Sequence, residues 1–217
     1  MNAIELVGQY LPMLLPGLWV SLQLLAMLVI IGTPLAFILA SAQRSRYRTL
    51  RGLAIVFVEI ARGMPSLILL YLVYFGLPTA GINLEAYWAA VIALSLNYAG
   101  YVSQTIKAGL ESIPQGQFEA ADSLALGRWT QLKYVILPQS FKIITPPLLS
   151  WIIVYFQTTS VGFAIAVPEM MSVAYSVAAA NFQYLTMFLL SGLIYAVISI
   201  PGSQAVSWLE NRTKPSH

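Results

Sequence analysis

The sequence predicts an all-α membrane protein with five transmembrane helices, and two observations support that prediction. The 217-residue chain is 59% hydrophobic but only 9% charged, whereas soluble domains carry about 25% charged residues. Its apolar residues also gather in runs long enough to cross a bilayer, which takes roughly 20 residues in a helix. We therefore expect lipid, and not water, to surround most of the chain.

Five apolar runs reach the length of a membrane span, and polar gaps separate them. The runs cover residues 17–40, 53–76, 86–107, 143–166 and 182–208. We assign them to one transmembrane domain, residues 16–208, which is followed by a short tail at 209–217. No internal repeat is visible in the sequence.

The segment before the first run is interpreted as a separate helix. It lacks the basic start of a secretory signal, and four of its apolar residues share one face at helical spacing: Ile4, Val7, Leu11 and Leu14. We expect residues 1–15 to lie in the membrane interface, with a bend at Pro16-Gly17 before the first span. An extended start of the first span is the alternative.

The basic residues predict how the spans are oriented, because cytoplasmic loops are enriched in Lys and Arg. They cluster at 41–52, around 108–142 and in the tail, whereas the gaps at 77–86 and 168–181 contain none. We therefore expect the 41–52 loop, the 108–142 loop and the C-terminus in the cytoplasm, and the N-terminus outside. Because membrane-length apolar runs separate the basic clusters, a nucleic-acid-binding face is not expected.

The composition also argues against most catalytic chemistry. Cysteine is absent and the one histidine is His217, so neither a thiolate nor a histidine metal site is expected. The sequence has no GxxxxGK[ST] phosphate loop, so we do not expect this chain to hydrolyse ATP. A membrane-embedded enzyme would need converging acids, bases or metal ligands, and the runs contain few of them.

The second run carries two charges and a proline. Glu59 and Arg62 stand at i and i+3, so they share a helix face and can partly neutralise each other. A charge at mid-membrane costs roughly 2.5–3.5 kcal/mol on insertion scales. Pro65 removes a backbone donor and predicts a kink. The group either lines or gates a pathway, or forms an ion pair that locks helices together.

The third run carries a polar stripe. Asn97, Tyr101 and Gln104 follow i, i+4, i+7 spacing, and a polar stripe in lipid must face the bundle interior. The stripe serves either helix packing or a translocation path, and we favour the path.

The fourth run ends in four consecutive polar residues, Gln157, Thr158, Thr159 and Ser160. They surround the helix, so at least one faces a cavity or a partner, unless they only cap the helix end. The fifth run is interpreted as packing.

The longest polar connection lies between the third and fourth runs. Pro114 stops the preceding helix, and Gln115–Leu126 predicts a short amphipathic helix that ends at Gly127. A second short helix is expected at Arg128–Leu137, before Pro138.

Small side chains in the first of these helices, Ala120 and Ala121, would let a partner backbone approach closely. The connection therefore either inserts into a groove on another protein or lies on the membrane surface.

This connection resembles the EAA loop of ABC-importer permeases. In that pattern EAA is followed by three residues, a glycine, nine residues and Ile-x-Leu-Pro. Glu119-Ala120-Ala121 and Val135-Ile136-Leu137-Pro138 stand at the expected separation. Ala125 occupies the glycine position, and Gly127 follows two residues later.

The resemblance extends over nearly the whole chain and is closest to the polar amino-acid uptake group, which includes histidine, glutamate, glutamine, arginine and opine permeases. Glu59–Pro65 is similar to that group's E-x-x-R-G-T-P block. Further blocks that match the group are Tyr74–Pro78, Ala93–Asn97, Ser112–Gln117 and Val135–Gln139.

The resemblance implies a type I, MetI-like permease of the bacterial inner membrane that imports polar amino acids. It implies as partners a second permease subunit, similar or identical, two ABC ATPase subunits that bind ATP and magnesium, and an external solute-binding protein. No cofactor is implied in this chain. The implied coupling loop covers about 112–138, and its implied ATPase-coupling residues are Glu119, Ala120, Ala121, Leu124, Gly127 and Pro138. A stand-alone secondary transporter or channel is the alternative.

Two departures from the family bear on the substrate path. Family members often carry an acidic residue where Gln104 stands, and K-D-T-S where Gln157–Ser160 stand; those charges are linked to holding a substrate's amino or guanidinium group. Both positions are neutral here, so a substrate ammonium loses a charge-assisted bond. Either this subunit is the non-binding half of a heterodimer, which we favour, or its substrate is anionic. The residues assigned to the path are Glu59, Arg62, Asn97, Tyr101, Gln104, Gln157, Thr158, Thr159 and Ser160.

Overall fold

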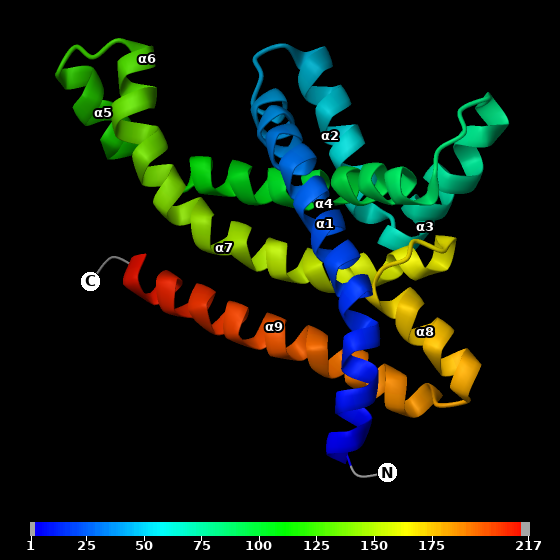
Figure 1. Ribbon diagram of the computed structural model, residues 1–217. Helices are drawn as coiled ribbons and strands as arrows, with labels where there is room; N and C mark the ends of the chain where they lie inside the picture. The colour runs from blue at the N-terminus through cyan, green and yellow to red at the C-terminus, as the bar shows by residue number, and fades with distance from the viewer. Residues whose placement is uncertain (1–2, 214–217) are drawn as a thin grey trace.

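The computed structural model describes residues 3–213 and the side chains of residues 8–212, and within these residues it contains helices and no strand. The helix α4 (Ala86–Glu111) runs through the middle of the fold and packs against α1, α2, α3 and α7 (Figure 1). The other helices are α1 (Ala3–Gln43), α2 (Arg48–Gly63), α3 (Ser66–Tyr71), α5 (Gln115–Ser123), α6 (Arg128–Gln131), α7 (Leu137–Thr158), α8 (Met170–Asn181) and α9 (Tyr184–Thr213).

Within the part of the chain that the structure describes, three helical segments are long and apolar enough to cross a membrane: Gly8–Gln43, Arg128–Ile165 and Tyr184–Arg212. The bent pair formed by α2 and the helical segment that starts at Ser66 provides a fourth candidate. All five predicted runs coincide with helices, but α4 does not pass the same test. More than half of the residues of α4 are buried, so its surface has little need to be apolar. The all-α membrane fold is confirmed, and the count of five spans stays a prediction.

The separate N-terminal helix predicted at 1–15 is not seen, because α1 continues as one helix through Pro16 and Gly17. The side chains of Tyr10 and Leu14 are buried in a small core with α8 and α9. This packing holds the helix together across prolines that would weaken it if it were isolated. Residues 1–2 and the side chains of Ile4 and Val7 lie outside the described part.

The kink predicted at Pro65 is a complete break of the helix. Residue Met64 is extended (φ −88°, ψ 136°), as expected for a residue whose α conformation clashes with the following proline ring. The helical segment resumes at Ser66 and is turned by 106° from α2. The second run therefore changes direction inside the bundle.

Two boundaries in the 112–138 loop also differ from the sequence prediction. Helix α5 ends at Ser123, before the expected Gly127, and Gly127 instead precedes α6. The helix that starts at Arg128 does not stop at Pro138 but continues into α7 through a π-helical turn at Leu132–Ile136. Pro138 has no N–H to donate, and its ring crowds the preceding turn of the helix. The wider π-helical turn before it makes room for this ring.

Helix α8 lies in a gap where no helix was expected. Glu169 accepts hydrogen bonds from the backbone N–H groups of Met171 and Ser172 and so caps the helix start. α8 then packs against both α1 and α9. At the other end of the chain, α9 extends to Thr213, into the segment assigned to the tail, and residues 214–217 lie outside the described part.

The closest approach between α1 and α8 depends on Gly17. A Cβ atom at this position would lie 2.8 Å from the Cα atom of Met170, so we expect Gly17→Ala to destabilise the chain by about 1–3 kcal/mol. The matched control is Gly8→Ala in the same helix, where a Cβ atom would meet nothing within 4 Å and helix propensity favours alanine by roughly 0.5–1 kcal/mol. Thermal unfolding in detergent measures both variants, and equal midpoints would contradict the close contact.

Candidate functional site

The break between α2 and α3 leaves backbone carbonyl groups without helical partners, and polar side chains of α4 bind them. Asn97 Nδ2 donates to the carbonyl oxygens of Ala61 (2.7 Å) and Met64 (3.4 Å). The hydroxyl of Tyr101 donates to the carbonyl oxygen of Arg62 (2.8 Å). Because lipid offers no hydrogen bonds to such groups, these contacts are what allows the helix to break inside the bundle.

Asn97 also connects this break to α7. Its Oδ1 accepts a hydrogen bond from the hydroxyl of Tyr155 (2.6 Å), and its side chain is buried. Tyr155 lies edge-on to Tyr98, with ring centroids 5.0 Å apart. One carboxamide thus joins α2, α4 and α7, and the stripe predicted on the third run provides helix-packing contacts.

The same residues line a small hollow of about 260 Å³ between the start of α3, α4 and the end of α7. Three of the predicted path residues meet here, namely Asn97, Tyr101 and Thr158. The remaining lining residues are Ser66, Trp151, Val154 and Tyr155. None of the seven is charged, so the hollow offers hydroxyl, amide and aromatic groups to a solute.

Other predicted path residues do not reach this hollow. Gln104 Nε2 donates to Gln43 Oε1 (2.9 Å), which ties α4 to the end of α1. The hydroxyls of Thr159 and Ser160 donate to backbone carbonyls three residues earlier, as side chains at a helix end do. Gln157 lies outside the hollow and lines a separate groove.

Glu59 and Arg62 form the predicted ion pair, with 2.8 Å between Oε2 and the guanidinium nitrogen. Both residues belong to α2, so the pair does not lock two helices together. Their side chains are 53% and 41% exposed, on a face that no other described element covers. The pair neutralises two charges on that open face of α2.

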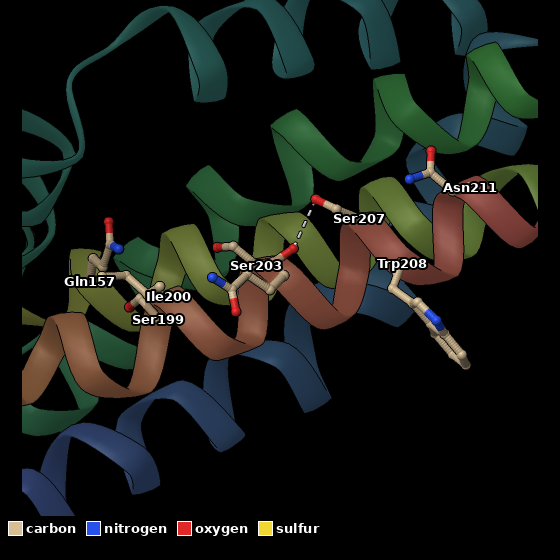
Figure 2. Close-up of a pocket in the computed structure, with 8 residues that line it drawn as sticks. Gln157, Ser199, Ile200, Ser203, Ser207, Trp208 and Asn211 are labelled. Atoms are coloured by element: carbon tan, nitrogen blue, oxygen red, sulfur yellow. Dashed lines mark hydrogen bonds between the residues drawn. The ribbon is translucent and has the colours of Figure 1, made fainter.

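A second, larger hollow was not anticipated from the sequence. It is a groove of about 530 Å³ that follows α9 beside the end of α7 (Figure 2). Its lining residues are Gln157, Ser199, Ile200, Ser203, Gln204, Ser207, Trp208 and Asn211. The three serines recur at every fourth position of the sequence. The fifth run was interpreted as packing, and that interpretation overlooked this polar pattern.

Glu169, at the start of α8, is a buried acid. Besides its two backbone donors, its carboxylate accepts a hydrogen bond from the hydroxyl of Tyr195 in α9 (3.3 Å). The next residue, Met170, donates its N–H to the hydroxyl of Ser21 in α1 (3.2 Å). These bonds fasten the start of α8 to both neighbouring helices. Within the described residues, no three acidic or histidine side chains gather as a metal site would require.

The 112–138 loop stands apart from the other helices at the far end of α7 (Figure 1). Most of the residues predicted to couple to an ATPase are exposed there: Glu119, Ala120, Leu124, Gly127 and Pro138. Ala121 is the exception and is buried inside the loop. Leu124 is 73% exposed and Trp129 is 71% exposed, so two large apolar side chains project from the tip.

Internal hydrogen bonds hold the loop in one shape. The Gln131 amide donates to the Asp122 carboxylate, which joins α6 to α5. Gln139 Nε2 donates to Gln117 Oε1 (3.0 Å), which joins α7 to α5. The short helices therefore move with α7, which continues directly into the bundle.

Ala125 is strained at the end of α5. Its φ angle is +54°, and the N–H of Leu126 reaches back to the carbonyl oxygen of Ala121 (3.2 Å), a pattern that usually carries glycine. The structure thus places the bend at Ala125, where the EAA pattern has its glycine, and not at Gly127.

Comparisons with known proteins identify the family. The family model for the inner membrane component of binding-protein-dependent transport systems matches residues 32–215. This chain belongs to that family. The predictions that it is a permease subunit of the inner membrane, and that it is not itself the ATPase, are confirmed by this membership.

Named relatives cover nearly the same length as the chain. The arginine transport system permease protein ArtQ of Bacillus subtilis is 36% identical over 87% of this chain and 86% of its own length. The glutamate/aspartate import permease protein GltK of Escherichia coli is 32% identical, with 94% of each chain covered.

Solved structures agree with the fold. A crystal structure described as an amino acid ABC transporter with histidines superposes with a TM-score of 0.91 at 30% identity and covers 98% of this chain and 99% of its own. The MetNI methionine ABC transporter in an inward-facing conformation gives a TM-score of 0.70 at 19% identity, covers 96% of this chain and 99% of its own, and supports the fold alone.

Because Asn97 contacts three helices, we expect its removal to destabilise the fold. Asn97→Ala leaves the Ala61 carbonyl and the Tyr155 hydroxyl without their bonds, so we expect a loss of roughly 2–4 kcal/mol. Ser95→Ala is the control, because Ser95 is equally buried in α4 but makes one long hydrogen bond of 3.5 Å to Leu28. Thermal unfolding should separate the two variants, and similar midpoints would show that the break does not depend on Asn97.

Because Ala125 is strained, we expect its replacement by glycine to stabilise the loop. Ala125→Gly should stabilise the end of α5 by up to about 1 kcal/mol, because glycine adopts positive φ freely. Hydrogen exchange of the Leu126 amide should slow. The control is Ala120→Gly, because Ala120 is exposed within α5. In this variant the exchange of the Leu126 amide should become faster. Faster exchange in both variants would contradict the left-handed conformation.

Proposed function

We propose that this chain is the membrane path and the mechanical lever of an ATP-driven importer of polar amino acids. The observation that carries the proposal is the exposed 112–138 loop, with its Glu119-Ala120-Ala121 sequence, at the end of a helix that runs into the bundle. Amino-acid permeases such as ArtQ and GltK are relatives over nearly the full length. A stand-alone channel or secondary transporter gains no support, since the family works with binding proteins.

The partners follow from this assignment. Two ATPase subunits bind ATP and magnesium and dock on the 112–138 loops of two permease subunits. A binding protein delivers solute on the outer face of the membrane. In this arrangement the 41–52 loop, the 112–138 loop and the C-terminus face the cytoplasm, and the N-terminus lies outside. The distribution of Lys and Arg supports this orientation.

The coupling residues act as a rigid unit in this mechanism. Closing of the ATPases pushes on α5, where Glu119 is exposed and Leu124 projects. Because Gln139 and Gln131 tie α5 to α7 and α6, the push tilts α7. The bundle then exchanges between outward-facing and inward-facing states that nucleotide biases.

The substrate path takes a neutral or zwitterionic solute in this proposal. The hollow around Asn97, Tyr101 and Thr158 contains no charged residue, and Gln104 is already bonded to Gln43. A subunit of this kind suits the non-binding half of a heterodimer, whose partner supplies any charged group. Of the other predicted path residues, Glu59 and Arg62 lie on the open face of α2, and Gln157 lines the groove beside α9. Thr159 and Ser160 are bonded to backbone carbonyls at the end of α7.

Charge reversal at Glu119 tests the lever. We expect Glu119→Arg, in the assembled transporter in nanodiscs, to reduce binding-protein-stimulated ATP hydrolysis and amino-acid uptake roughly tenfold, because a reversed charge at an interface opposes docking. The control is Glu111→Arg, which is exposed at the end of α4 but outside the EAA pattern, and which should leave both rates unchanged. Full coupled activity in Glu119→Arg would refute the assignment.

A further inference from the structure

The inner half of α9 is polar on one side, although the helix is apolar enough to span a membrane. Ser199, Ser203 and Ser207 follow one another at every fourth position, and Gln204 and Asn211 widen the same side. Hydroxyl and carboxamide groups exposed to lipid would lose their hydrogen bonds with water, so such a side is expected to face protein or a water-filled space.

The stripe is buried at Ser199 and exposed at Ser203 and Ser207. It forms one wall of the 530 Å³ groove, and Gln157 at the end of α7 forms part of the other (Figure 2). Gln157, Gln204 and Asn211 are all exposed. The Ser199 hydroxyl oxygen is buried and has no hydrogen-bond partner within the described residues. A buried hydroxyl without a partner is unfavourable, so a small opening of the groove that admits water or a solute to Ser199 would complete its hydrogen bonds.

The groove begins close to the hollow at the centre of the fold. Gln157 lines the groove and its neighbour Thr158 lines the hollow, so the two linings are one residue apart along α7. From Ser199 to Asn211 the helix rises about 18 Å at 1.5 Å per residue, which is more than half of a hydrocarbon core of roughly 30 Å. The groove therefore follows α9 from a point near the hollow toward the C-terminal end of the helix.

We propose that this groove is the inner half of the solute path and that it passes neutral or zwitterionic polar solutes. Hydroxyls and carboxamides both donate and accept hydrogen bonds, so they replace the water around an ammonium and a carboxylate alike. No lining residue is charged, which keeps the solute from being held too tightly to leave. The inference rests on the proposed import function and adds α9 to the path.

Three properties favour solvent over a second protein copy as the occupant. Five of its lining residues on α9 carry hydroxyl or carboxamide groups, its long carboxamides are exposed, and it begins one residue along α7 from a hollow that is also lined by polar groups. A second copy seated in it would instead cover Ser203 and Ser207 and make them inaccessible from water. These two arrangements give opposite results in a labelling experiment.

The chain has no cysteine, so single cysteines can be introduced without removing any native thiol. We would place Ser203→Cys and Ser207→Cys in the assembled complex in membranes and treat them with a charged, water-soluble methanethiosulfonate. The control is Ala205→Cys, a small exposed residue at the same depth that does not line the groove. Because only a hydrated thiol ionises to the reactive thiolate, we expect labelling of the groove cysteines to be at least about tenfold faster than that of the control.

Amino-acid uptake after labelling gives the second measurement. We expect it to fall severalfold in the Ser203→Cys and Ser207→Cys complexes and to stay unchanged in Ala205→Cys. Equal labelling rates at all three positions would overturn the path. So would a disulfide between two Ser203→Cys subunits on oxidation with no labelling, because that result means that a second copy fills the groove.

The two proposals fail separately. Labelling is measured without transport, so it tests the groove alone. If the unmodified complex with its binding protein and ATP takes up no amino acid, the proposed function is wrong whatever the labelling pattern. If uptake is normal and the groove cysteines are unreactive, only the assignment of α9 is wrong.

Discussion

The contact between α4 and the broken end of α2 is the constraint on which the rest of the structure depends. Pro65 forces Met64 out of the helix, and the freed carbonyl groups need donors at a depth where lipid provides none. Asn97 and Tyr101 supply these donors. Because Asn97 also accepts a bond from Tyr155, the position of α7 is set by the same side chain.

This arrangement explains why the polar residues of the third run both pack helices together and line a hollow. The groups that satisfy the break of α2 line one side of a hollow, and the aromatic rings of α7 close the other side. The hollow exists because a helix that turns by 106° cannot fill the space that a straight one would occupy. Chemistry that stabilises the break therefore creates the polar surface that a solute can use.

The 112–138 loop, at the other end of α7, combines a strained backbone with exposed apolar side chains. The loop that ends α5 holds Ala125 in a left-handed conformation and projects Leu124 and Trp129 beyond the bundle. In the proposed assembly, the ATPase that docks on this loop would cover both side chains. The hydrogen bonds of Gln131 and Gln139 make the loop a continuation of α7, which suits a lever more than a flexible tether.

Sequence alone determined the membrane class, the helices behind all five apolar runs, the Glu59–Arg62 pair and the family, because hydropathy, i to i+3 spacing and a fixed motif are local properties of the chain. It did not determine where helices begin and end near prolines. α1 runs through Pro16 because Tyr10 and Leu14 are packed against distant helices, and the helix from Arg128 runs through Pro138 by widening one turn. Nor did it show that Gln104 is bonded to Gln43, that Glu169 joins α8 to α9, or that the serines of α9 border a groove. Those outcomes belong to the tertiary structure, because a polar side chain in a membrane takes its role from the group that the fold brings opposite to it.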